Sequence, residues 1–276
     1  MEGSCKNYHI KTQHGRINYY VLGKGPKVML CFHGYGQDAS AMIPLASIMS
    51  EDYTSYCFDL FHHGKSFWSS KEHAIEKSFW VEVLTQFLSE QNIKTFSITA
   101  FSLGGKLALV TTEYFISQID ELILLAPDGI KTQRWYNLAT YPGVFKNFFK
   151  SVIIKPHRFY RVVNTLNHMG VLDKGIKKFA FKEMSTLRQR RLMYYSWVAF
   201  RNLSTDSGKI IRLLNEANTK VTMYLGHYDK IITQEGVAKF TDNLDSIDLV
   251  LLNSGHNSLV AELVNHLQSN ASLPKG

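Results

Sequence analysis

Residues 100–105, Ala-Phe-Ser-Leu-Gly-Gly, lie between an apolar run that predicts a buried strand and a segment with helical spacing. A serine at such a junction occupies a sharp strand-to-helix turn, in which its backbone is strained and its hydroxyl is exposed. The turn requires small residues two positions before and after Ser102; Gly104 meets this requirement fully, and Ala100 adds one methyl group. On these six residues alone, a serine that merely caps a helix is the alternative interpretation.

The rest of the chain predicts a series of parallel strands joined by helices, because short apolar runs alternate with helical periods. The predicted strands are Arg16–Leu22, Lys27–Phe32, Tyr53–Phe58, Thr95–Ala100, Glu121–Ala126, Val221–Gly226 and Ile247–Leu252. Helices are predicted over residues 75–91, 106–115 and 233–243, and from about Ser258 onward. We therefore expect an α/β protein with a mostly parallel, doubly wound sheet.

Residues 129–219 interrupt this series and are rich in aromatic residues and helix formers. They predict a helical cap inserted into a core domain that comprises residues 1–128 and 220–276. Within the insertion, residues 143–155 (GVFKNFFKSVIIK) place apolar side chains on one side of a helix and lysines on the other. Such a helix either covers an apolar pocket or lies on a membrane surface, and we favour the first interpretation.

Charge is distributed unevenly along the chain, although the net charge is only +8. Residues 131–212 hold 17 Lys plus Arg and 3 Asp plus Glu, a balance of +14, which leaves −6 for the remainder. A basic cap would steer an anionic substrate toward the site. No nucleic-acid-binding module is recognisable in the stretch, so we expect a small-molecule substrate and no nucleic-acid partner. The sequence predicts no particular oligomeric state.

Several further features indicate a cytoplasmic protein without a cofactor. The first ten residues lack the apolar run of a signal peptide, and no segment approaches the roughly 18 apolar residues of a membrane span. The three cysteines have no metal-site spacing, and two of them lie in predicted strands as reduced core residues. The adjacent His62 and His63 lack further ligands at suitable spacing, so we expect no metal.

Partners for Ser102 follow two predicted strands on the carboxyl side of the insertion. A serine hydroxyl needs a base to take its proton and an acid to orient that base. Asp229 and His256 each follow a strand, where open parallel sheets place their sites. Asp128, which follows the strand before the insertion, is the alternative acid, and His227 is a less favoured base.

In these motifs and in the order Ser102, Asp229, His256, the chain resembles the α/β-hydrolase superfamily over nearly its whole length. The resemblance is to the serine-nucleophile branch with a helical cap inserted after the sixth strand. It implies that the His33-Gly34-Tyr35-Gly36 stretch shapes an oxyanion hole, with the backbone N–H groups of Tyr35 and Leu103 as donors. Residues 59–66 also resemble the D-x-x-G-x-G-x-S loop of the family, except that His62 stands where a glycine or proline is common.

The resemblance implies hydrolysis of a carboxylic ester or thioester through an acyl-enzyme, and we expect the substrate to have an apolar acyl part. A serine at the turn excludes the relatives that use a carboxylate there, the haloalkane dehalogenases and epoxide hydrolases. Candidate pocket residues are His33, Gly34, Tyr35, Phe101, Leu103, Trp135, Tyr141 and Phe145. Two alternatives stay open: a C–C bond hydrolase or triad-dependent lyase acting on an anionic substrate, and a pseudo-hydrolase that only binds a ligand.

Overall fold

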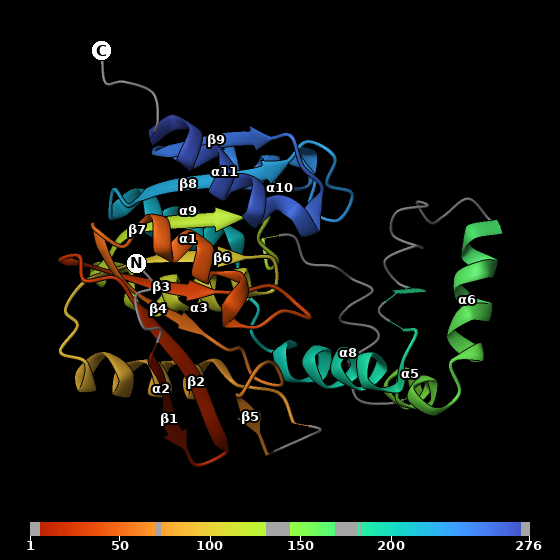
Figure 1. Ribbon diagram of the computed structural model, residues 1–276. Coiled ribbons are helices and arrows are strands. Elements are labelled where there is room, and N and C mark those ends of the chain that lie inside the picture. The colour runs from red at the N-terminus through yellow and green to blue at the C-terminus, as the bar shows by residue number, and fades with distance from the viewer. Residues whose placement is uncertain (1–5, 70–72, 131–143, 169–180, 183, 272–276) are drawn as a thin grey trace. The chain divides into compact units, whose positions relative to one another are not determined.

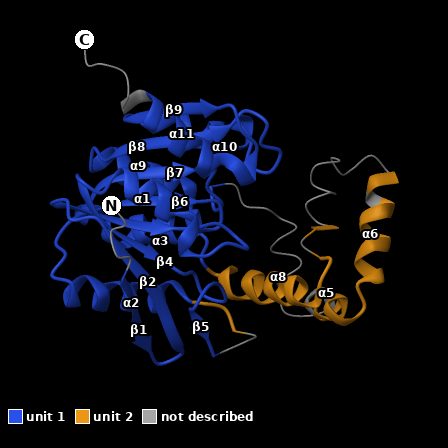
Figure 2. Cartoon of the chain, in the orientation of Figure 1, with its two compact units in different colours: residues 1–69, 76–131, 203–276 blue, residues 70–75, 132–202 orange. Residues whose placement is uncertain are grey.

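The computed structural model describes residues 6–69, 73–130, 144–168, 181–182 and 184–271 (Figure 1). The chain divides into two compact units (Figure 2). Unit 1 comprises residues 1–69, 76–131 and 203–276, and unit 2 comprises residues 70–75 and 132–202. Among the residues that the structure describes, no helix is both long enough and apolar enough to cross a membrane.

Unit 1 is built on a nine-stranded sheet. Its strands are β1 (Lys6–Thr12), β2 (Gly15–Leu22), β3 (Lys27–Phe32), β4 (Tyr53–Phe58), β5 (Phe67–Trp68), β6 (Phe96–Phe101), β7 (Ile119–Leu125), β8 (Lys220–Gly226) and β9 (Ile247–Leu252). The order is β1-β2-β4-β3-β6-β7-β8-β9, with β5 paired to β2. All pairs are parallel except those that β2 makes with β1, β4 and β5. The prediction of a mostly parallel sheet is confirmed.

Helices of unit 1 pack on this sheet (Figure 1). They are α1 (Ile43–Ile48), α2 (Lys77–Glu90), α3 (Gly104–Phe115), α9 (Ser207–Glu216), α10 (Gln234–Thr241) and α11 (Leu259–Ala271), with short 3-10 turns η1 (Ala39–Ala41), η2 (Ile116–Gln118) and η3 (His256–Ser258). Helix α1 contacts α11, whereas α3 contacts α2 and α9, and α9 contacts α10. The helix predicted over residues 75–91 is α2, and its buried residues recur every three or four positions, as the pattern requires.

Aromatic side chains fill much of the core between β2, β3, β4 and α2. Phe87 of α2 packs edge-on against Phe58, and Trp80 packs edge-on against Phe32. The indole N–H of Trp80 donates to Thr111 Oγ1 at 3.0 Å, which satisfies the polar group of this fully buried ring.

Two cysteines are buried neighbours in this core, Cys31 on β3 and Cys57 on β4. A hydrogen bond with Cys31 and burial raise the pKa of Cys57 well above its ordinary value. A thiol in this state is a poor nucleophile, which agrees with the predicted core role. The third cysteine, Cys5, lies outside the described residues.

Unit 2 is helical in its described part, with α5 (Val144–Ile154), α6 (His157–His168) and α8 (Leu187–Phe200). The amphipathic helix predicted over residues 143–155 is therefore present as α5. Ile153 packs with Tyr194 and Val198 of α8. The apolar side of α5 is only partly covered, because Phe148 is 42% exposed and Ile154 is 80% exposed.

Helix α9 lies inside the predicted insertion but belongs to unit 1. Its buried residues, Ile210 and Leu214, lie on the helix that contacts α3 and α10. Unit 2 thus ends at residue 202 rather than 219, and it includes residues 70–75, which the sequence did not associate with it. Helical spacing marks a buried face without showing which unit covers it. Strand β7 corresponds to the predicted strand Glu121–Ala126 and directly precedes the insertion.

Candidate active site

Ser102 lies on a strained turn between β6 and α3. Its φ angle is +47°, in the left-handed region that few residues other than glycine adopt. The turn is fixed on both sides: the Ser102 N–H donates to Leu125 O at 3.0 Å, and Ser102 O accepts the N–H of Asp128 at 2.8 Å. A Cβ atom on Gly104 would lie 2.4 Å from Phe32 O, so this position requires glycine. The turn predicted from residues 100–105 is the one observed.

His256 connects Ser102 to Asp229. Its Nε2 lies 2.9 Å from Ser102 Oγ, and its Nδ1 lies 2.6 Å from Asp229 Oδ2. A carboxylate only accepts, so Nδ1 carries the hydrogen and Nε2 is left to accept from the serine hydroxyl. The structure therefore brings the three predicted residues together in the arrangement that serine nucleophiles require.

Asp229 is held in place by backbone groups of the loop after β8. Its Oδ1 accepts the N–H groups of Ile231 at 2.7 Å and Ile232 at 3.0 Å, while Oδ2 faces the histidine. The residue is 4% exposed. Because each carboxylate oxygen has a different partner, the orientation of the group is fixed.

The two alternative assignments find other partners. The Asp128 carboxylate lies 4.0 Å from Lys106 Nζ, in a distant ion pair, while the His256 Nδ1 is occupied by Asp229. His227 is exposed and packs edge-on against the Tyr228 ring. Neither residue takes a place in the hydrogen-bonded series from Ser102 to Asp229.

The two predicted oxyanion donors lie on separate elements. Leu103 is the N-cap residue of α3, and backbone N–H groups at the start of a helix have no partner within it. Tyr35 lies in the loop after β3 (residues 33–38, the β3 loop). Within this loop the Gly34 N–H donates a hydrogen bond to Gln37 Oε1 at 2.9 Å, which stabilises the turn.

Two of the predicted pocket residues, Gly34 and Phe101, are linked by contacts to the triad. A Cβ on Gly34 would lie 2.7 Å from the Phe101 ring, so the two are closely packed, and His33 is fully buried beside them. The Phe101 ring lies 5.1 Å from that of His256, measured between centroids. Trp135 and Tyr141 lie outside the described residues, and for Phe145 only the backbone, in α5, is described.

The loop after β4 (residues 59–66, the β4 loop) supports the β3 loop, a role that the sequence analysis missed. Asp59 Oδ1 accepts the N–H of Ala39 at 2.8 Å, and Ala39 is the first residue of η1, directly after the β3 loop. His62 has a φ of +67°, in the left-handed region that favours glycine. His62 thus takes a backbone conformation that glycine adopts more readily.

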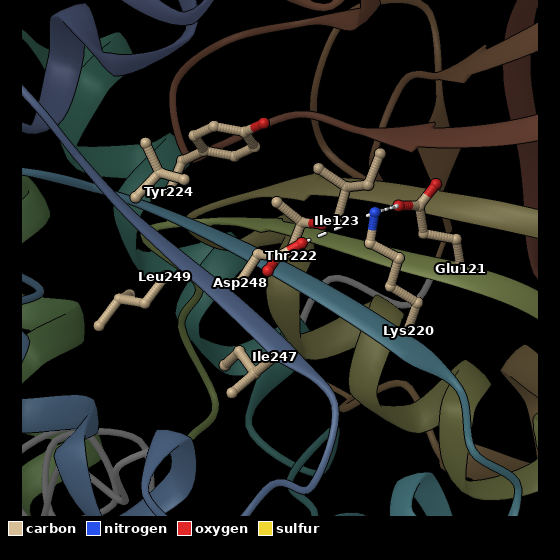
Figure 3. Close-up of a pocket in the computed structure, with 9 residues that line it drawn as sticks. Glu121, Ile123, Lys220, Thr222, Tyr224, Ile247, Asp248 and Leu249 are labelled. Carbon is tan, nitrogen blue, oxygen red and sulfur yellow. Dashed lines mark ion pairs between the residues drawn. The ribbon is translucent and has the colours of Figure 1, made fainter.

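A groove of about 460 Å³ lies elsewhere on unit 1, over β7, β8 and β9 (Figure 3). Lys220 lies within it, 3.6 Å from Glu121 and 3.6 Å from Asp248. None of the triad residues lines it: its residues are Glu121, Ile123, Lys220, Thr222, Tyr224, Ile247, Asp248, Leu249 and Val250. In the described part of the chain, no group of three or more His, Cys, Asp or Glu side chains is arranged to hold a metal ion.

Comparison with known proteins gives structures that share the fold across nearly the whole chain. Naproxen esterase from Bacillus subtilis is 16% identical, with a TM-score of 0.60 over 97% of this chain and 90% of that one. A thermophilic esterase from Thermogutta terrifontis is 14% identical, with a TM-score of 0.68 over 96% and 97%. The thioesterase domain from the curacin biosynthetic pathway is 16% identical, with a TM-score of 0.63 over 96% and 100%.

The sequence relatives match a smaller part of the chain. Uncharacterised proteins of Mycobacterium bovis and Mycobacterium tuberculosis are 26% identical over 121 residues, which is 44% of this chain. The match covers 35% of each relative, so the chain spans about a third of their length. A family model described as alpha/beta hydrolase fold matches residues 27–262. With the fold, the strained serine turn and this match together, the chain belongs to the α/β-hydrolase fold family.

Proposed function

We propose that the protein is a serine hydrolase that cleaves a carboxylic ester or thioester through an acyl-enzyme intermediate. One observation carries the proposal: His256 bridges Ser102 Oγ at 2.9 Å and Asp229 Oδ2 at 2.6 Å. This arrangement supplies the nucleophile, the base and the group that orients the base. A pseudo-hydrolase that only binds a ligand would not need all three groups joined by these hydrogen bonds.

In the proposed reaction, Ser102 Oγ attacks the substrate carbonyl carbon while its proton passes to His256 Nε2. Asp229 keeps its carboxylate on Nδ1–H and stabilises the imidazolium that forms. The tetrahedral intermediate then collapses: the bond to the leaving alcohol or thiol breaks, and the leaving group takes the proton from Nε2. Water repeats the sequence on the acyl-enzyme and releases the carboxylic acid.

The backbone N–H groups of Tyr35 and Leu103 are the proposed donors to the oxyanion. The position of Leu103 at the start of α3 supports its role, since the helix N-terminus also favours negative charge. Removal of one donor from such a hole typically lowers kcat by about 100- to 1,000-fold.

We propose that the substrate has an apolar acyl group and that unit 2 acts as the cap. The buried Phe101 and Leu103 beside Ser102 support an apolar acyl site, and the solved neighbours include esterases and a thioesterase domain. The balance of +14 in residues 131–212 favours an anionic group on the substrate. That charge is also what favours the second candidate, a C–C bond hydrolase or lyase that acts on an anionic compound.

The test is turnover of p-nitrophenyl esters of increasing acyl length by the purified protein and by Ser102→Ala. Wild type should release p-nitrophenol, and the variant should lose the activity above the buffer rate. Undiminished turnover by a folded Ser102→Ala protein would contradict the proposal. Turnover of anionic diketones without any ester hydrolysis would favour the second candidate.

A further inference from the structure

The β3 and β4 loops are held together by two histidines that act in opposite directions. His33 of the β3 loop accepts the N–H of Leu60, in the β4 loop, on its Nε2 at 3.0 Å. His63 of the β4 loop accepts the N–H of Gly36, in the β3 loop, on its Nε2 at 3.1 Å. The two rings meet edge-on, with centroids 5.3 Å apart. Each loop thus carries an imidazole that accepts a backbone N–H of the other.

The second nitrogen of each ring fixes its tautomer. His63 Nδ1 lies 2.9 Å from Phe61 O, and His33 Nδ1 lies 2.7 Å from Gly34 O. A carbonyl oxygen only accepts, so both Nδ1 atoms carry hydrogen and both Nε2 atoms present a lone pair. Burial and the neighbouring His63 lower the pKa of His33 to about 3, and burial lowers the pKa of His63. Both rings are therefore neutral acceptors at neutral pH.

His63 acts on the part of the β3 loop that carries Tyr35. Gly36, whose N–H it accepts, directly follows Tyr35 and has a φ of +74°. The His63 ring also packs edge-on against the Tyr35 ring, with centroids 5.9 Å apart and planes 87° apart. The ring thus contacts both the backbone after Tyr35 and the side chain of Tyr35.

We propose that His63 is a positioning residue, which fixes Gly36 and the Tyr35 ring so that the Tyr35 N–H points at the substrate oxyanion. This inference rests on the proposed serine hydrolase function. A displacement of the donor by about 1 Å can lower the rate by about 100-fold, because the hydrogen bond must be in place when the charge develops. Binding of the substrate before the attack does not need this hydrogen bond, so the loss should appear in kcat and not in KM.

Two variants separate acceptor chemistry from packing. His63→Phe keeps a planar ring but removes the Nε2 acceptor, whereas the Oε1 of His63→Gln can still accept the Gly36 N–H. With a p-nitrophenyl ester, we expect His63→Phe to lose about 100-fold in kcat with KM changed by less than about threefold. His63→Gln should recover at least about a tenth of the wild-type kcat. The matched control is His9→Phe, at an exposed histidine of β1, which should retain wild-type values.

A measurement on the unaltered protein covers the case in which His63→Phe does not fold. Long-range proton–nitrogen correlation spectra of the wild type report the tautomer of each histidine. We expect His63 to carry its hydrogen on Nδ1 at neutral pH. A hydrogen on Nε2 would overturn the inference, because that atom could not then accept from Gly36.

The kinetic outcomes are equally decisive. A folded His63→Phe protein with wild-type kcat contradicts the role of His63 but leaves the serine chemistry standing. Equal losses in His63→Phe and His63→Gln also contradict it, since packing rather than the acceptor would then matter. If the wild type neither hydrolyses esters nor reacts with a fluorophosphonate, the proposed function itself fails, and the positioning role fails with it.

Discussion

Replacement of Asp229 by asparagine should nearly abolish activity while leaving the fold intact. Oδ1 accepts two backbone N–H groups, from Ile231 at 2.7 Å and Ile232 at 3.0 Å. The asparagine oxygen would keep these bonds, so its NH₂ group would face His256 in place of Oδ2. That NH₂ donates to Nδ1 and thereby favours the hydrogen on Nε2, where it blocks proton transfer from Ser102. A wrong tautomer of this kind lowers kcat by about 10,000-fold, or roughly 5.4 kcal/mol.

The assay is kcat for a p-nitrophenyl ester at neutral pH, with thermal unfolding as the measure of folding. Asp128→Asn is the matched control, because Asp128 also follows a strand end but its carboxylate lies nearest Lys106, at 4.0 Å. It should retain kcat within about threefold, since it leaves the hydrogen bonds of His256 unchanged. A folded Asp229→Asn protein with more than a tenth of wild-type kcat, or a greater loss in Asp128→Asn, would refute the reasoning.

Three further predictions concern stability and substrate charge. Gly104→Ala should destabilise by about 1–3 kcal/mol in urea unfolding, because its Cβ would meet a β3 carbonyl oxygen at 2.4 Å. Gly255→Ala, which meets no atom within 4 Å, should stay within about 0.5 kcal/mol. Burial would raise the pKa of Glu113, but hydrogen bonds from Lys209 and Lys77 outweigh it and hold the pKa below its ordinary value. The stabilisation from the ionised Glu113 carboxylate is present above the unfolded-state pKa and is lost as pH falls through the folded-state pKa. Glu113→Gln should therefore destabilise the protein at pH 7 and have no effect on its stability in acid. An equal effect at both pH values would contradict this prediction. If the basic segment steers substrate, kcat/KM for a succinate half-ester should fall with added salt while that for a neutral ester does not; equal salt dependence would contradict steering.

Much of the site could be predicted from the sequence because each triad residue follows its own strand. The turn at Ser102 has a local signature, since only small residues fit around it, and Gly104 shows this directly. Asp229 and His256 were placed by strand ends and chain order alone. Which of Asp128 and Asp229 reaches the histidine depended on long-range geometry, which the sequence left open.

The parts that could not be predicted depend on tertiary contacts. The role of His63 follows from an acceptor that reaches a backbone N–H 27 residues away, and no local pattern encodes such a bond. Helix α9 was assigned to the insertion because an amphipathic pattern does not show which unit covers its buried face. Strand β1 was missed, because only Ile10 of its seven residues is buried and the alternation that marks a half-buried strand is nearly absent.

The central claim is that Ser102 is an activated nucleophile, and covalent labelling tests it most directly. The purified protein would be treated with a fluorophosphonate, and the adduct located by intact mass and peptide mapping, with Ser102→Ala and His256→Ala alongside. The account predicts one adduct on Ser102 in the wild type and none at that position in either variant. No adduct on a folded wild-type protein, or an adduct at Ser102 that persists in His256→Ala at the wild-type rate, would contradict it.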